Sequence, residues 1–273
     1  MRGEFVDVAG RRLYYYAAGT RGRGDPVVLL HGFPGSSHSW RLVVPLLPEG
    51  RRVVVPDLAG SGRSDGPGAA GGTLHDHAAL VTGLLDNLGI ERAALVGHGF
   101  GGGVALAMAV AHQSRVAALA LIGTPAFGAW PRRLGRLARL AAPFGGALGP
   151  AVLASFVHGS ALRGFADRDA GRRSLDISLR ASASRLGLDA IRANLRAQQD
   201  PAIATLAADL AHLSVPTTVI WGEADPFLDP SVGRRLRDAI PGATLALIPG
   251  ARHFVAEDAP DQCARAIRAL LER

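Results

Sequence analysis

The chain has 273 residues, a formal net charge of +7 and 30 basic residues, all of them arginine, but only one cysteine, Cys263. A single cysteine excludes an internal disulfide and a cysteine-based metal cage. No interleaving of aromatic and basic residues accompanies the charge, which argues against a nucleic-acid partner. Residues 125–212 hold 12 Arg and 6 Asp, so most of the surplus lies in one segment, either as a solvated helical face or as an attraction for an anionic ligand.

The N-terminal stretch MRGEFVDVAGRRLYYY alternates charged and apolar residues and lacks the hydrophobic run of a signal peptide, which predicts a cytoplasmic protein. The long apolar stretch at 93–111 is interrupted by His98 and several glycines. This interruption favours a strand, a turn and a helix over a membrane span, so we expect no membrane partner. The length suits one large α/β domain with an insertion.

The first half of the sequence alternates strand and helix patterns. Apolar or alternating runs predict strands at 5–8 and 13–18, and in the stretches PVVLLHG from residue 26, RVVVPDL from 52, AALVGH from 93 and VAALALIG from 116. Helical patterns lie between them at 37–47, 74–88 and 101–112. Strands that alternate with helices predict a doubly wound, mostly parallel sheet.

The alternation stops after residue 124. From 125 to 212 the sequence reads as several helices, with Arg on one side and Leu, Ala and Phe on the other. The alternation resumes with TTVIWGEADPF from 217, a helix at 232–239, TLALIPGARHF from 244 and a final helix at 257–271. We predict a core domain of residues 1–124 and 213–273, with 125–212 as a helical cap over the carboxyl edge of the sheet, where open α/β folds bind ligands.

Five motifs follow one another along the chain: HGFPGSSHSW from residue 31, PDLAGSGRSD from 56, GHGFGG from 97, WGEADPF from 221 and GARHFVAEDAP from 250. In this order and at this spacing they closely resemble the α/β-hydrolase superfamily. The HGFP form of the first motif, with a helical cap after the sixth strand, is most similar to the branch of epoxide hydrolases and haloalkane dehalogenases. The resemblance implies an α/β-hydrolase fold with an eight-stranded sheet.

The resemblance assigns His253 as the catalytic histidine and Asp225 as the acid that orients it. Each follows an apolar run, in a loop at the carboxyl end of one of two predicted neighbouring strands, so their side chains are expected to meet. The backbone N–H groups of Phe33 and Phe100 resemble an oxyanion hole, and the second opens a helix whose dipole favours negative charge. We expect the side chain of His98 to point away from this site.

Position 99, where the elbow of hydrolases carries its nucleophile, is a glycine. The elbow residue usually has a positive φ, which glycine adopts without the cost of about 1–3 kcal/mol that other residues incur. Gly99 is therefore expected to preserve the turn and to leave the nucleophile position vacant. We predict substrate contacts from His38, Trp130 and Phe254, and we expect no metal and no cofactor.

Three functions fit this pattern. In the first, which we favour, the His253–Asp225 dyad is a general base and the oxyanion hole an electrophilic clamp. The reaction is then a non-hydrolytic step, such as intramolecular addition, cyclisation, C–C bond formation or a lyase reaction. The expected substrate is a bulky, largely apolar small molecule, such as a polyketide-like intermediate, and the expected assembly is a monomer or a homodimer.

The second function is an epoxide hydrolase, dehalogenase or esterase whose nucleophile has been replaced by Gly99. Against the epoxide hydrolase, the predicted cap has no tyrosine to donate to an epoxide oxygen. Against the dehalogenase, Phe100 stands where such enzymes usually place a halide-binding tryptophan, although Trp130 could serve instead. The third function is a non-catalytic binding protein, which would not require both members of the dyad.

Overall fold

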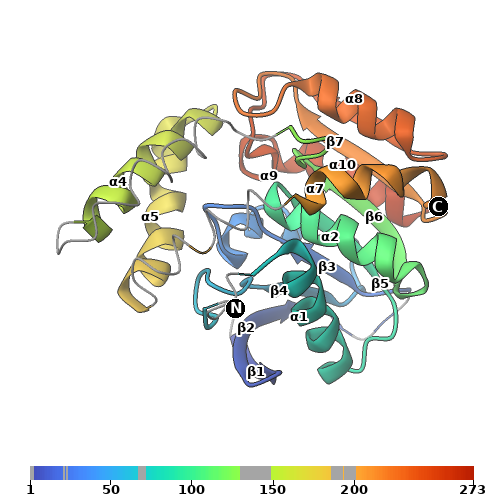
Figure 1. Cartoon of the computed structure of the whole chain (residues 1–273), viewed down its shortest axis with the longest axis horizontal. Coiled ribbons are helices and arrows are strands. Elements are labelled where there is room, and N and C mark those ends of the chain that lie inside the picture. The colour runs from blue at the N-terminus through green and yellow to red at the C-terminus, as the bar shows by residue number, and fades with distance from the viewer. Residues whose placement is uncertain are drawn as a thin grey trace.

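The computed structural model describes residues 3–20, 22, 24–66, 72–129, 149–185, 193 and 201–273. In this part of the chain eight strands form one sheet in the order β1-β2-β4-β3-β5-β6-β7-β8. The strands are β1 (Gly3–Val8), β2 (Arg11–Ala18), β3 (Val27–Leu30), β4 (Val53–Pro56), β5 (Ala93–His98), β6 (Val116–Ile122), β7 (Thr217–Gly222) and β8 (Thr244–Ile248). β2 pairs antiparallel with β1 and β4, and all other pairs are parallel (Figure 1).

The central strands are buried on both faces. Every residue of β3, β5 and β7 is buried, which explains why these strands read as continuous apolar or small-residue runs instead of alternating ones. Helices α1 (Leu74–Asn87), α2 (Phe100–Ala111) and α8 (Pro230–Ala239) contribute to the core on one face. Helix α10 (Pro260–Leu271) packs on the other face with Trp40 and Val43. The predicted doubly wound, mostly parallel sheet of eight strands is therefore confirmed.

The described part of the segment between β6 and β7 contains three α-helices together with turns and loops. It contains α4 (Gly149–Ala161), α5 (Arg168–Arg185) and the short α7 (Ala202–Thr205). Figure 1 shows α4 and α5 as an adjacent pair beside the core, and we call them the cap helices. The domain boundaries at 124 and 213 stay predictions. None of the helices in the described part of the chain combines the length and hydropathy needed to cross a bilayer.

Two helix predictions are wrong, and both errors involve proline. The expected helix at 37–47 is instead two 3-10 turns, Ser37–Trp40 and Val44–Leu46, because Pro45 has no N–H and its ring would clash with a helical carbonyl four residues earlier. The expected helix at 257–271 is divided into α9 (Val255–Asp258) and α10. Ala259 has φ −143° between them, since a residue that precedes proline avoids the helical conformation.

Candidate active site

The turn between β5 and α2 has the backbone shape predicted for it. Gly99 has φ +53° and ψ −119°, so the positive φ expected at the elbow is confirmed. A Cβ atom placed on Gly99 would lie 3.6 Å from His253 Nε2 and 3.6 Å from Gly32 Cα. Any side chain at position 99 would therefore begin between the imidazole and the loop that follows β3.

The second part of the site is a buried pair of side chains at the ends of β7 and β8. These strands are hydrogen-bonded neighbours, so the loops at their carboxyl ends bring Asp225 and His253 together. His253 Nδ1 lies 2.8 Å from Asp225 Oδ2, and the two side chains are 8% and 0% exposed. Because the carboxylate accepts, Nδ1 carries the proton and Nε2 of the neutral ring is left with a lone pair, which is the form of a general base.

Asp225 is held as an anion by several donors. Its Oδ1 accepts from the backbone N–H groups of Phe227 at 2.8 Å and Leu228 at 3.1 Å. Burial alone would raise the pKa of Asp225, but the charge of His253, the bond from its ring and these two N–H groups together lower that pKa below its usual value. The carboxylate is thus fixed in the geometry that orients the imidazole.

The predicted oxyanion hole consists of the backbone N–H groups of Phe33 and Phe100, which follow Gly32 and Gly99 in the chain. No hydrogen bond within the described residues occupies the N–H of Phe33 or that of Phe100. Phe100 begins the 12-residue helix α2, whose N-terminal dipole favours negative charge. Gly32, next to Phe33, is the residue whose Cα would lie 3.6 Å from a Cβ at position 99. The two free N–H groups therefore lie on chain segments that meet at the elbow, as an oxyanion hole requires.

The expectation that the side chain of His98 points away from the site is wrong. The His98 ring lies 4.9 Å from the His253 ring, centroid to centroid, and His98 Nε2 is 3.0 Å from the carbonyl oxygen of His253. Burial, with a further effect from His253, lowers the pKa of His98 to about 3, so this ring is neutral and its Nε2–H donates to that carbonyl. This hydrogen bond, together with packing of the ring against Gly32, holds His98 beside the His253 loop.

The three predicted substrate-contact residues, His38, Trp130 and Phe254, have different positions in the structure. Trp130 lies outside the described residues. His38 is half-buried in the 3-10 turn after Phe33, and burial and Arg41 lower its pKa. Phe254 is 4% exposed and stacks on Phe165 of the cap segment at 4.0 Å, so packing accounts for its position. Substrate contact by any of the three stays a prediction.

Sequence reasoning missed two groups around His253. The ring of Phe227 lies edge-on to the His253 ring at 5.2 Å and forms part of its apolar surroundings. Glu257 and Asp258, which follow His253 in α9, hydrogen bond to the cap segment. The available signal was a pair of adjacent carboxylates directly after the apolar run that begins at Phe254.

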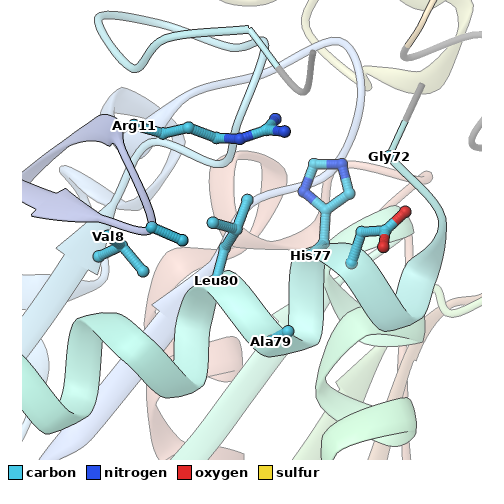
Figure 2. Close-up of a pocket in the computed structure, with 8 residues that line it drawn as sticks. Val8, Arg11, Gly72, His77, Ala79 and Leu80 are labelled. Carbon is cyan, nitrogen blue, oxygen red and sulfur yellow. The ribbon is translucent and has the colours of Figure 1, made fainter. Parts of the chain in front are cut away.

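A surface cavity of about 240 Å³ lies elsewhere, between the β1–β2 hairpin and α1. It is lined by Val8, Ala9, Arg11, Gly72, Asp76, His77, Ala79 and Leu80, and Figure 2 shows Arg11 extending from the hairpin toward His77. None of the candidate catalytic residues lines this cavity, and it is not the candidate active site. Among the described residues, no group of three His, Cys, Asp or Glu side chains could hold a metal ion.

The sheet, the elbow and the buried dyad define a protein of the α/β-hydrolase class, and comparison with known proteins agrees. A family model described as alpha/beta hydrolase fold matches residues 25–260. Haloalkane dehalogenase 2 of Mycobacterium tuberculosis is 30% identical over 273 residues, covering 96% of this chain and 92% of that protein. Epoxide hydrolase A of the same species is 43% identical over 124 residues, covering 44% of this chain and 38% of that protein.

A solved structure gives the same result. An esterase from Thermogutta terrifontis superposes with a TM-score of 0.80 and 28% sequence identity, covering 100% of this chain and 98% of that one. The chain therefore belongs to the α/β-hydrolase family. The relatives named here are enzymes that act on small molecules.

Gly99→Ala tests the strain at the elbow. No atom lies closer than 3.6 Å to the added Cβ, so the cost is conformational, and we expect the free energy of unfolding to fall by about 1–3 kcal/mol in urea titrations. The control is Gly159→Ala in α4, where the Cβ meets no atom within 4 Å and helix propensity predicts a gain of about 1 kcal/mol. Equal effects of the two substitutions would contradict the strained elbow.

Asp225→Asn tests the buried carboxylate through pH. A carboxyl with a lowered pKa stabilises the fold above its unfolded pKa of about 3.9, and this contribution is lost as the pH falls through the folded value. The parent is therefore expected to exceed the variant in unfolding free energy near pH 7, with the difference narrowing below about pH 4. Asp209→Asn, at an exposed position, is the control. A difference that stays constant with pH would rule out this role for the charge.

Proposed function

We propose that this chain is a cofactor-independent enzyme in which His253, oriented by Asp225, acts as a general base without a covalent intermediate. The observation that carries the proposal is the geometry around Gly99. The base keeps its 2.8 Å bond to the carboxylate, while no side-chain atom of residue 99 stands between Nε2 and the reacting molecule. A base without a nucleophile beside it suits proton transfer better than acyl or alkyl transfer to the enzyme.

In the proposed reaction, a negative charge develops on the carbonyl oxygen of the substrate. His253 Nε2 takes a proton from a carbon atom next to a carbonyl group, and the electron pair moves onto the carbonyl oxygen. The N–H groups of Phe33 and Phe100 stabilise that oxyanion, while Asp225 stabilises the imidazolium. The electron pair then attacks a second centre of the same molecule or expels a leaving group, and His253 returns its proton.

The rate enhancements expected from the base and the oxyanion hole are large enough for such a step. General base catalysis contributes about 10²–10⁴ in rate, and one oxyanion donor contributes about 10²–10³. Together they support an intramolecular addition, a cyclisation, a C–C bond formation or a lyase reaction, but not the hydrolysis of an unactivated amide. The partly buried ring of Phe227 beside His253 supports a bulky, largely apolar substrate, for which we propose a polyketide-like molecule.

A second candidate function is a hydrolase whose nucleophile has been replaced. The likeness to a haloalkane dehalogenase over 96% of this chain favours it. This candidate predicts that a nucleophile restored at position 99 creates hydrolysis, whereas the proposed function predicts that it does not.

Two assays separate these functions. The first follows deuterium uptake at the α-carbon of propiophenone in D₂O by NMR. The parent is expected to accelerate the exchange, and His253→Ala to reduce that acceleration by about 10²–10⁴-fold. His75→Ala, an exposed histidine of α1, is the control. No acceleration by the parent, or equal rates for parent and His253→Ala, would refute the general base.

The second assay compares the parent with Gly99→Asp and Gly99→Ser on 1,2-dibromoethane, styrene oxide and p-nitrophenyl acetate. The proposed function predicts less than about a tenfold gain in any hydrolysis rate. A gain of about 10³-fold or more that also requires His253 would identify a hydrolase and overturn the proposal. A ligand bound tightly but left unchanged would point to the binding protein.

A further inference from the structure

The loop that carries His253 is held by backbone bonds on both sides of the histidine. The N–H of Arg252 donates to Asp258 Oδ2 at 2.8 Å, and the N–H of Phe254 donates to the carbonyl of Gly164 at 3.1 Å. Gly164 belongs to the turn between the cap helices α4 and α5. The position of His253 therefore depends on a segment about ninety residues earlier in the chain.

Asp258 joins the two segments directly. While Oδ2 accepts from Arg252, Oδ1 accepts from the N–H of Ala166 in the cap segment at 2.9 Å. Arg252 adds a side-chain bond from Nη1 to the carbonyl of Arg163 at 3.0 Å. Burial raises the pKa of Asp258, but both backbone donors and the charges of Arg252 and His253 oppose that effect. Three hydrogen bonds thus connect the cap turn to residues around His253, and a fourth joins Arg252 to Asp258 within the His253 segment.

Glu257 forms a second connection, to the other half of the site. Its carboxylate accepts from Arg41 Nη1 at 2.8 Å and from Ser174 Oγ of α5 at 2.7 Å. Arg41 lies just after the 3-10 turn that follows Phe33. The hydroxyl oxygens of Ser36 and Ser178 lie 3.0 Å apart and join the same segment to α5. Helix α5 is therefore bonded both to the segment that follows Phe33 and to the helix that follows His253.

We propose that Asp258 is a positioning residue, whose carboxylate transmits the position of the cap helices to His253, and that the cap is in this way a structural part of the catalytic machinery. Glu257 holds α5 and the Phe33 segment at the same junction. This inference rests on the proposed role of His253 as the base, and it adds that a bond about five residues away along the chain sets the direction of that base. The turn at 163–166 is then a fixed attachment of the cap.

The proposal is tested in the full chain by NMR, without a substrate. One probe is the Nδ1–H proton of His253, whose low-field signal reports its bond to Asp225. The other is the rate at which the backbone amides of Arg252, Phe254 and Ala166 exchange with D₂O. Asp258→Asn keeps one acceptor oxygen but presents an NH₂ group to the second N–H donor. We expect the His253 signal to shift or broaden, and the amides of Arg252 and Ala166 to exchange at least about tenfold faster.

The control is Asp261→Asn, at an exposed position in the first turn of α10 three residues away, which should leave both observations unchanged. Faster amide exchange with an unchanged His253 signal would show that Asp258 only stabilises the fold, and it would overturn the proposal. Unchanged amides would overturn it as well.

A measurement on the parent covers the case in which Asp258→Asn does not fold. If the cap turn and the His253 loop form one unit, the amides of Arg252, Phe254 and Ala166 should exchange within about threefold of one another. Exchange of Ala166 that is about a hundredfold faster would separate the cap from the loop and contradict the proposal. A failure of the propiophenone assay would contradict the general base alone, because neither NMR observation depends on turnover.

Discussion

The close approach of α2 to the sheet is the constraint on which the rest of the candidate site depends. A Cβ atom on Gly97 would overlap the carbonyl of Gly101, and one on Gly101 would overlap the carbonyl of Leu30. Without these side chains the first turn of α2 lies against the ends of β3 and β5. The helix N-terminus and the loop after β3 then meet beside Gly99, at the carboxyl edge where parallel sheets bind ligands. None of these contacts involves a side chain at position 99, so the glycine there leaves them intact.

Position 99 therefore matters for the chemistry of the site but not for the packing contacts that form the fold. The neighbouring glycines and the buried strands set the backbone at 99 without any contact from a side chain at that position. A scaffold of this kind explains why relatives of this chain can carry names as different as haloalkane dehalogenase and epoxide hydrolase. Membership fixes the scaffold and the place of the chemistry, whereas the atoms beside His253 Nε2 decide what is done there.

Local pattern was sufficient to predict the strands, and the resemblance of the motifs to α/β hydrolases was needed to pair Asp225 with His253. The central strands are short runs of buried residues, and Asp225 and His253 follow the neighbouring strands β7 and β8, whose pairing brings them together. What local pattern misjudged was the effect of single residues on helices. Pro45 and Pro260 override the helical spacing of their neighbours, because a missing N–H and a restricted preceding residue act at one position that periodicity averages away.

The contacts that sequence could not reveal are those between distant segments with no periodic signal. The bond from Ala166 to Asp258 spans 92 residues, and the bond from Arg41 to Glu257 spans 216. A carboxylate four or five residues after a histidine is equally compatible with an exposed first turn of a helix. The direction of the His98 ring was misjudged for the same reason, since it depends on the loop of His253, 155 residues away.

The buried histidines around the elbow show why one of them is suited to hold a proton. Burial lowers the pKa of His98 to about 3 and that of His77 to about 4, and it also lowers the pKa of His31 despite the nearby charge of Asp57. These three rings are neutral at neutral pH. His253 is the one of the four whose ring is bonded to a carboxylate in the described structure. In the proposed reaction, a proton taken from a substrate would be stabilised at His253, where Asp225 supplies the opposite charge, and not on the adjacent ring of His98.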